Sequence, residues 1–208
     1  STVAIGLPRN QPWYRRALNL LGKYYIVVAT AILVVYLAAS TSTFLSPGNI
    51  SNLLLQVSFA GIVAIGMTIL IAAGLFDLSV AGIAAVSGVC LAIVLPHSTV
   101  AVAILVAIGV GAILGAINGL VVTRMRIAAF IATLGTFNVF LAIAFILTDG
   151  GVISVGSTAF RQIVMAKVGI VPVAFIVLVV LAVAAHLLLS RTYFGRAVRA
   201  VGSNERAA

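Results

Sequence analysis

The stretch GLFDLSVAG, residues Gly74–Gly82, lies inside an apolar run that extends over residues 50–95 and contains the only formal charge of that run, Asp77. The run is more than twice as long as a single helix needs to be to cross about 30 Å of hydrocarbon. A glycine followed three residues later by an aspartate is its only strong turn signal. The chain is therefore expected to turn back at this stretch, with one membrane-spanning helix on each side of it.

The composition of the whole chain agrees with a membrane protein. Of its 208 residues, 63% are hydrophobic and 7% are charged, whereas a soluble domain has about 25% charged residues. So few polar side chains cannot cover so many apolar ones in water. Several apolar segments, each long enough to cross a bilayer, explain the balance.

Six membrane spans are predicted, and the expected fold class is an all-α, polytopic transmembrane helix bundle. The predicted spans are Tyr24–Phe44, Asn52–Ala73, Leu78–Leu95, Thr99–Val122, Ile127–Leu147 and Ile170–Leu189. The expected organisation is an N-terminal segment (1–23), a transmembrane domain (24–189) and a C-terminal segment (190–208).

The positions of the twelve cations predict the orientation. If the N-terminus is cytoplasmic, ten of them lie on the inside and two outside, in the segment Thr148–Gly169. Since cytoplasmic loops carry an excess of Lys and Arg, both ends are expected in the cytoplasm. Because the cations cluster at membrane boundaries, nucleic acid is not expected as a partner. The glycine- and serine-rich segment Thr148–Gly169 is expected to be a surface loop or a short lip.

The turn at Asp77 then faces the cytoplasm. Gly74 is expected to end one helix, and the Asp77 carboxylate to cap the next by accepting hydrogen bonds from the backbone N–H groups of Ser79 or Val80. A direct contact between Asp77 and a solute is the less favoured alternative.

Material for acid, base or metal chemistry is scarce, because the chain has three acidic residues and two histidines. No catalytic residue and no metal site is predicted. Neutral polar residues inside the spans suit a hydroxyl-rich solute better than an ion. The weakly supported candidates for a solute path are Gln56, Asn118 and Asn138.

A ridge of small residues recurs every four positions in the fourth predicted span. Its members are Ala103, Ala107, Gly111, Gly115 and Gly119. Small residues on one helical face allow another backbone to approach closely. Helix packing within the chain is the favoured explanation, and a dimer interface is the alternative.

The C-terminal segment is predicted to contain a short helix over residues 196–201 that Gly202 stops. Ser203 or Asn204 would then cap a further helix that begins at Glu205. Only four residues follow Asn204, which is too few for a helix that stands alone. The chain is therefore expected to be truncated at its C-terminus.

Four motifs occur in order along the chain: GMTILIAAGLFDLSVAGIAAVSG (66–88), GAINGLVVTRMRI (115–127), FIATLGTFNVFLAIAFILTDGG (130–151) and RTYFGRAVRAVGSNERAA (191–208). Together they resemble the permease subunits of ABC importers for monosaccharides, of the ribose and xylose type, within the branched-chain amino acid and sugar permease superfamily. Leu75 and Ala81 stand where glycine is usual in such permeases, and Arg206 stands where many have a second glutamate.

This resemblance implies a permease in the plasma (inner) membrane of a prokaryote that moves a monosaccharide by alternating access. The implied partners are a second permease copy, a cytoplasmic ATPase that holds ATP and Mg, an external sugar-binding protein and membrane lipid, with no cofactor in this chain. The final motif is similar to the EAA-type loop that contacts the ATPase. The residues expected to make that contact are Arg196, Gly202, Asn204 and Glu205.

Two other functions stay open at this point. A permease for branched-chain amino acids would share the fold, although a zwitterionic substrate calls for more charge or exposed helix ends along the path. A secondary transporter or channel would work without ATP. An intramembrane enzyme is a distant third, because it needs an ionisable or metal cluster that the sequence lacks.

Overall fold

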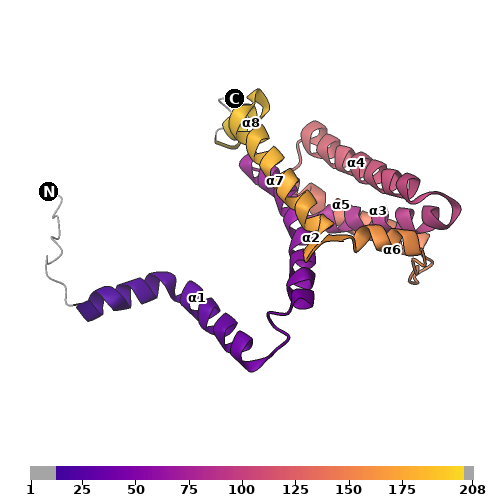
Figure 1. Cartoon of the computed structure of the whole chain (residues 1–208). Helices are drawn as coiled ribbons and strands as arrows, with labels where there is room; N and C mark the ends of the chain where they lie inside the picture. The colour runs from indigo at the N-terminus through magenta and orange to yellow at the C-terminus, as the bar shows by residue number, and fades with distance from the viewer. Residues whose placement is uncertain (1–12, 204–208) are drawn as a thin grey trace, which may run out of the picture. The chain divides into compact units, whose positions relative to one another are not determined.

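The computed structural model describes residues 13–203, with side chains from residue 24 onward. Its elements are α1 (Trp13–Ser40), α2 (Pro47–Ala72), α3 (Val80–Val94), the 3-10 helix η1 (Leu95–His97), α4 (Val100–Met125), α5 (Ala129–Leu147), α6 (Thr158–Val164), β1 (Lys167–Val168), β2 (Val171–Pro172), α7 (Val173–Arg191) and α8 (Tyr193–Ser203) (Figure 1). The predicted all-α, multi-pass architecture is confirmed.

Five helical stretches among the described residues are long and apolar enough to cross a membrane: α2, α3 together with η1, α4, α5 and α7. The first predicted span, Tyr24–Phe44, corresponds to a shorter apolar helix, Tyr24–Ser40. α1 has a kink at Tyr24, whose φ of −117° and ψ of 16° are not helical. The described residues therefore contain five of the six predicted spans at full length, and the first predicted span is a shorter apolar helix.

The chain divides into two compact units, residues 1–50 and 51–208. In the second unit, α3 lies beside both α4 and α5 (Figure 1). Val86 of α3 is buried with Phe140 and Ala144 of α5, and these three residues form the core of the group. The surface of the other helices is largely apolar, as expected for helices that face lipid.

Close packing of α3 on α5 depends on Gly82. A Cβ at this position would lie 2.9 Å from the Phe137 carbonyl oxygen and 3.0 Å from Phe140 Cβ. One is a backbone oxygen and the other is a Cβ bonded directly to the backbone, so neither atom can be moved by a change of side-chain rotamer. The absence of a side chain at Gly82 is therefore what sets the distance between the two helices.

We expect Gly82→Ala to lower the free energy of unfolding of the protein by about 1–3 kcal/mol, the usual cost of overpacking. Gly88→Ala on the same helix is the matched control, because no atom lies within 4 Å of a Cβ at Gly88. The midpoint of thermal unfolding in detergent measures both effects. Equal midpoints for the two variants would contradict the packing described here.

The small-residue ridge of α4 has two different halves. Ala103 is fully buried, and a Cβ at Gly111 would lie 3.3 Å from Ser87 Oγ of α3. Gly115 and Gly119 have no neighbouring atom within 4 Å of an added Cβ. Helix packing within the chain therefore uses the first half of the ridge, and the second half borders open space.

The segment after α5 is more ordered than the predicted surface loop. Ser157 accepts a hydrogen bond from the Phe160 N–H at 3.3 Å and caps the short helix α6. β1 and β2 then form an antiparallel hairpin, in which Val168 pairs with Val171. Gly169 in its turn has a φ of +62°, a conformation that glycine adopts readily. Strands of two residues are too short to give a periodic pattern, which is why the sequence did not predict them.

The expectation that Gly202 stops a helix is wrong. α8 begins at Tyr193 and continues through Gly202 to Ser203. Its start is fixed by Thr192, whose Oγ1 accepts a hydrogen bond from the Gly195 N–H at 3.2 Å. Gly202 instead lies against the backbone of Ala72 at the end of α2, where an added Cβ would overlap the Ala72 carbonyl oxygen. Close approach of two backbones, and not helix termination, is the physical reason for this glycine.

Candidate functional site: the polar turn before α3

The turn between α2 and α3 begins with a glycine-terminated helix end. The Leu75 N–H donates to the Leu70 carbonyl and the Gly74 N–H to the Ile71 carbonyl, both at 2.9 Å. This pair of hydrogen bonds defines a Schellman motif. Gly74 has a φ of +76°, which a residue with a Cβ rarely adopts. α2 therefore ends before Gly74, and the chain turns away from the axis of that helix there.

Asp77 holds the start of α3 through Ser79. Asp77 Oδ1 accepts the Ser79 backbone N–H at 2.7 Å and the Ser79 hydroxyl at 2.6 Å. α3 begins at Val80, with Ser79 in the N-cap position. Of the two donors that the sequence suggested, Ser79 is the one that Asp77 binds. The carboxylate thus fixes the N-cap residue and lies two positions before it.

Asn118 of α4 extends this hydrogen-bonded chain. Its Nδ2 contacts Ser79 Oγ. Because the single hydroxyl proton of Ser79 goes to Asp77, the Ser79 oxygen must accept from the Asn118 amide. Ser79 is completely buried and Asn118 is 4% exposed. The remaining Asn118 oxygen, Oδ1, is buried without a hydrogen-bond partner.

Thr133 of α5 binds the same turn from another side. Thr133 Oγ1 accepts the Leu78 backbone N–H at 3.1 Å and donates to the Ala129 carbonyl at 2.7 Å. Leu78 lies outside any helix, so this bond satisfies a backbone donor that secondary structure leaves free. We call Asp77, Ser79, Asn118 and Thr133 the polar turn cluster. It joins the turn to both α4 and α5.

A pocket of about 140 Å³ lies beside the polar turn cluster. Leu75 and Phe76 line it from the turn, and Gly115 and Gly119 line it from α4. This is the half of the small-residue ridge where an added Cβ would have no atom within 4 Å. The pocket leaves free space next to the turn.

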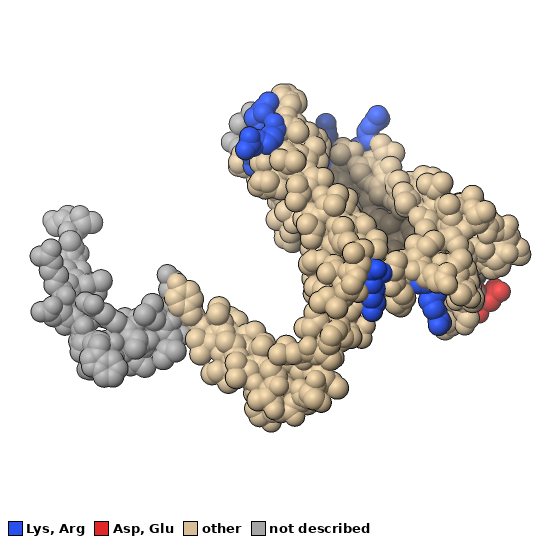
Figure 2. All heavy atoms as spheres, viewed as in Figure 1, with Lys and Arg blue, Asp and Glu red and all other residues tan. Residues whose placement is uncertain are grey.

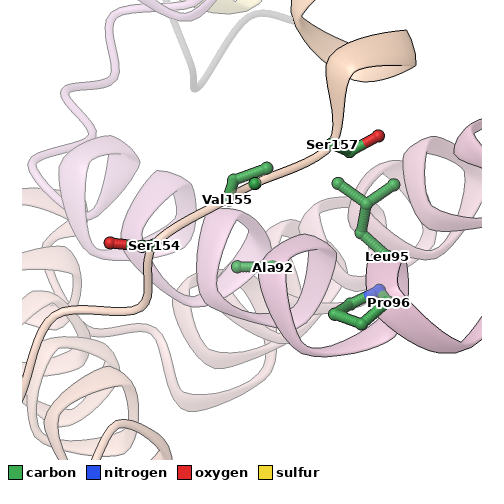
Figure 3. Close-up of a pocket in the computed structure, with 7 residues that line it drawn as sticks. Ala92, Leu95, Pro96, Ser154, Val155 and Ser157 are labelled. Atoms are coloured by element: carbon green, nitrogen blue, oxygen red, sulfur yellow. The ribbon is translucent and has the colours of Figure 1, made fainter.

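A second pocket, of about 350 Å³, lies at the opposite end of α3. Figure 3 shows the extended segment of Ser154, Val155 and Ser157 crossing the end of α3 near Leu95 and Pro96. None of the charged residues of the chain lines this pocket. Its lining of small and aliphatic groups offers no set of residues for acid or base chemistry.

The predicted ATPase-contact residues fall partly on α8. Arg196 is exposed on this helix, and its guanidinium carbon lies 5.8 Å from the centroid of the Tyr193 ring. Gly202 faces the end of α2. Asn204 and Glu205 lie outside the described residues. The neighbouring Arg199 donates to the Leu189 carbonyl at the end of α7.

The three predicted solute-path residues are not brought together by the pockets described here. Asn118 lines the pocket beside the turn. Gln56 on α2 and Asn138 on α5 are exposed, and the Asn138 amide donates to the Leu134 carbonyl of its own helix at 2.8 Å. Their role in a solute path stays a prediction.

Basic side chains gather at α8 and, well apart from it, near α6 (Figure 2). The surface between these two regions in this view is uncharged. Such a distribution is typical of a protein whose charged ends contact water on the two sides of a membrane. Within residues 13–203 no group of three or more His, Cys, Asp or Glu side chains is placed to hold a metal ion.

The apolar helices, the charged ends and the buried hydrogen bonds that hold an internal turn are those of a multi-pass membrane protein, and the relatives reported below place it in the plasma membrane. Residues 49–208 match the family described as the permease component of the branched-chain amino acid transport system. The chain belongs to this family. No solved structure matches the chain.

Two curated relatives show how far the likeness extends. The chain is 39% identical to the ribose import permease protein RbsC of Bacillus subtilis, over 85% of this chain and 56% of the relative. It is 33% identical to the L-arabinose transport system permease protein AraH of Escherichia coli, over 100% of this chain and 63% of the relative. The chain thus spans 56% to 63% of the length of these relatives.

Proposed function

We propose that the chain belongs to the membrane subunit of an ABC importer that moves a monosaccharide across the plasma membrane. The observation that carries this proposal is the likeness to permeases named for ribose and L-arabinose, which extends over 85% to 100% of the chain. Neutral hydrogen-bonding side chains inside the helices fit a solute that presents hydroxyl groups and no charge. The subunit itself performs no catalysis and holds no cofactor; a partner ATPase binds Mg and hydrolyses ATP.

A branched-chain amino acid is the second candidate substrate, because the description of the matching family names it. A zwitterion needs a counter-charge for its carboxylate and for its ammonium group. Asp77 is the only acidic residue between residues 47 and 147, and both of its hydrogen bonds go to Ser79. This arrangement favours the neutral sugar.

Reconstitution of the full-length permease with its ATPase and binding protein in liposomes tests the proposal. We expect ATP-dependent uptake of radiolabelled ribose or L-arabinose, and no uptake of leucine. Uptake of leucine alone would establish the second candidate. Sugar uptake that persists with a hydrolysis-deficient ATPase would place the protein among secondary transporters or channels. Under this proposal the bundle alternates access, with a second permease copy and an external sugar-binding protein as partners.

We further propose that α8 contacts the ATPase, with Arg196, Gly202, Asn204 and Glu205 as contact residues. α8 is amphipathic and carries exposed basic side chains. A cationic helix at the inner face can bind an acidic surface of a partner. The cytoplasmic position of both chain ends is part of the same proposal.

Reversal of the Arg196 charge tests this contact. We expect Arg196→Glu to weaken co-purification of the ATPase with the permease by at least about tenfold, since like charges opposed at an interface cost several kcal/mol and about 1.4 kcal/mol already corresponds to tenfold. Arg161→Glu is the matched control, because Arg161 is an exposed arginine on α6, which is far from α8 in Figure 1. Equal co-purification of both variants with the ATPase would refute the assignment.

A further inference from the structure

We infer that the turn formed by residues 73–79 is the joint through which movement of α8 reaches α3, α4 and α5. Ser79 and Thr133 are its positioning residues. The inference rests on the proposed contact between α8 and the ATPase, and it identifies the part of the membrane bundle on which that contact acts. Three features of the turn support this role: a backbone contact with α8, hydrogen bonds to α4 and α5, and free space beside it.

The first feature is a contact between backbones. Gly202 of α8 lies against the Ala72 carbonyl, and a Cβ on Gly74 would be 3.5 Å from Gly202 Cα. No side chain lies between the two glycines. A displacement of α8 therefore cannot be absorbed by a change of side-chain rotamer and must move the end of α2 or the turn.

The second feature is the attachment of the turn to two other helices. The Asn118 amide binds Ser79 across 39 positions of sequence, and Thr133 binds the Leu78 N–H across 55 positions. The Asn118 and Thr133 side chains are buried, with 4% and 3% exposure. Buried hydrogen bonds are costly to break without replacement, so the turn, α4 and α5 are expected to move together.

The third feature is space for a second arrangement. The pocket beside the turn measures about 140 Å³ and is bordered by Gly115 and Gly119, which have no side chains to block it. Asn118 Oδ1 is an acceptor without a partner. If the turn shifts, it can enter this space, and one of its N–H or O–H groups can donate a hydrogen bond to Asn118 Oδ1. A joint needs two discrete packed arrangements of this kind.

Paired substitutions in the full-length permease test the joint. Ser79→Ala and Thr133→Val each remove a hydroxyl that holds the turn. The matched controls are Ser87→Ala on α3, whose hydroxyl has no partner, and Thr136→Val on α5, whose hydroxyl binds the Thr133 carbonyl of its own helix. All four variants are reconstituted with the ATPase and the binding protein. The readouts are ATP hydrolysis, ATPase co-purification and the number of ribose or L-arabinose molecules imported per ATP hydrolysed.

We expect Ser79→Ala and Thr133→Val to lower sugar imported per ATP by at least about fivefold, the lower end of typical coupling between sites. Their basal ATP hydrolysis and co-purification should match those of the wild type, as should every readout of the two controls. Thr133→Ser, which keeps the hydroxyl, should restore coupling. Wild-type coupling in both test variants would overturn the joint. Absence of sugar import by the wild-type complex would instead refute the proposed function.

Discussion

Gly202→Ala is expected to lower the free energy of unfolding of the full-length permease by about 1–3 kcal/mol, the range found for overpacked contacts. An added Cβ would overlap the Ala72 carbonyl oxygen and would force α8 away from the end of α2. The same substitution makes an isolated helix more stable by up to about 1 kcal/mol. The two effects have opposite signs, so the sign of the measured change shows whether the contact between α8 and α2 exists.

Gly109→Ala is the control for this prediction. Gly109 also lies in a helix, but no atom lies within 4 Å of a Cβ at that position. We expect Gly109→Ala to be neutral or stabilising in thermal unfolding and to preserve sugar uptake, whereas Gly202→Ala should reduce uptake roughly tenfold, within the usual range of coupling between sites. If the Gly202→Ala variant is as stable and as active as the Gly109→Ala variant, then the backbone of α8 is not in close contact with the end of α2.

The helices of this fold could be predicted because each one is encoded locally. Hydrophobic runs long enough for a bilayer crossing give α2, α4, α5 and α7, and the Gly74 signal divides the longest run at the correct place. The predicted and observed ends of α3, α4, α5 and α7 differ by at most three residues, and α2 begins five residues before its predicted start. The first helix is less well defined by its sequence, because its apolar part continues past Ser40 into residues that form turns.

Two errors of prediction have a common cause. From the sequence alone, a glycine at position 202 suggests the end of a helix. Its role in packing becomes visible only from its contact with Ala72, which lies 130 positions earlier in the sequence. The hairpin of β1 and β2 consists of two residue pairs, too few for any periodic signal. In both cases the deciding contact is absent from the local sequence.

The same limit applies to the candidate site. The bond from Asp77 to Ser79 spans two positions, so turn chemistry suggests it directly. The bonds of Ser79 to Asn118 and of Leu78 to Thr133 join residues that belong to different helices. In the sequence, Asn118 stood out as a candidate for the solute path, and Thr133 is only one of several polar residues within apolar spans. Their common target is set by how α3, α4 and α5 pack.

The charge at residue 77 is explained by the donors that surround it. Ser79 is completely buried, and its backbone N–H and hydroxyl both donate to the Asp77 carboxylate. An ionised acceptor makes stronger hydrogen bonds than a neutral one. A carboxylate at this position therefore orders the turn and the start of α3 in an otherwise apolar stretch. We therefore expect stability and sugar uptake to depend on the acceptor oxygens of the Asp77 side chain more than on its charge.

Asp77→Ala and Asp77→Asn separate these two properties. Asp77→Ala leaves two donors of Ser79 without a partner, and each unpaired buried donor costs about 1–3 kcal/mol. We expect a loss of about 2–4 kcal/mol in the free energy of unfolding and near-total loss of sugar uptake. Asp77→Asn keeps a side-chain oxygen that can accept from Ser79, so its cost should be about 1 kcal/mol or less and its uptake should stay within about twofold of wild type.

Thermal unfolding in detergent and sugar uptake in liposomes measure both variants, with membrane insertion as the common control. If Asp77→Asn inserts and folds normally but abolishes uptake, the carboxylate charge itself takes part in transport, and the turn would have to be reassigned as part of the solute path. If Asp77→Ala is as stable as the wild type, Ser79 has other hydrogen-bond partners and the polar turn cluster does not hold α3. The expected order of wild type, Asp77→Asn and Asp77→Ala, in both stability and uptake, follows only if the acceptor oxygens of Asp77 fix the turn.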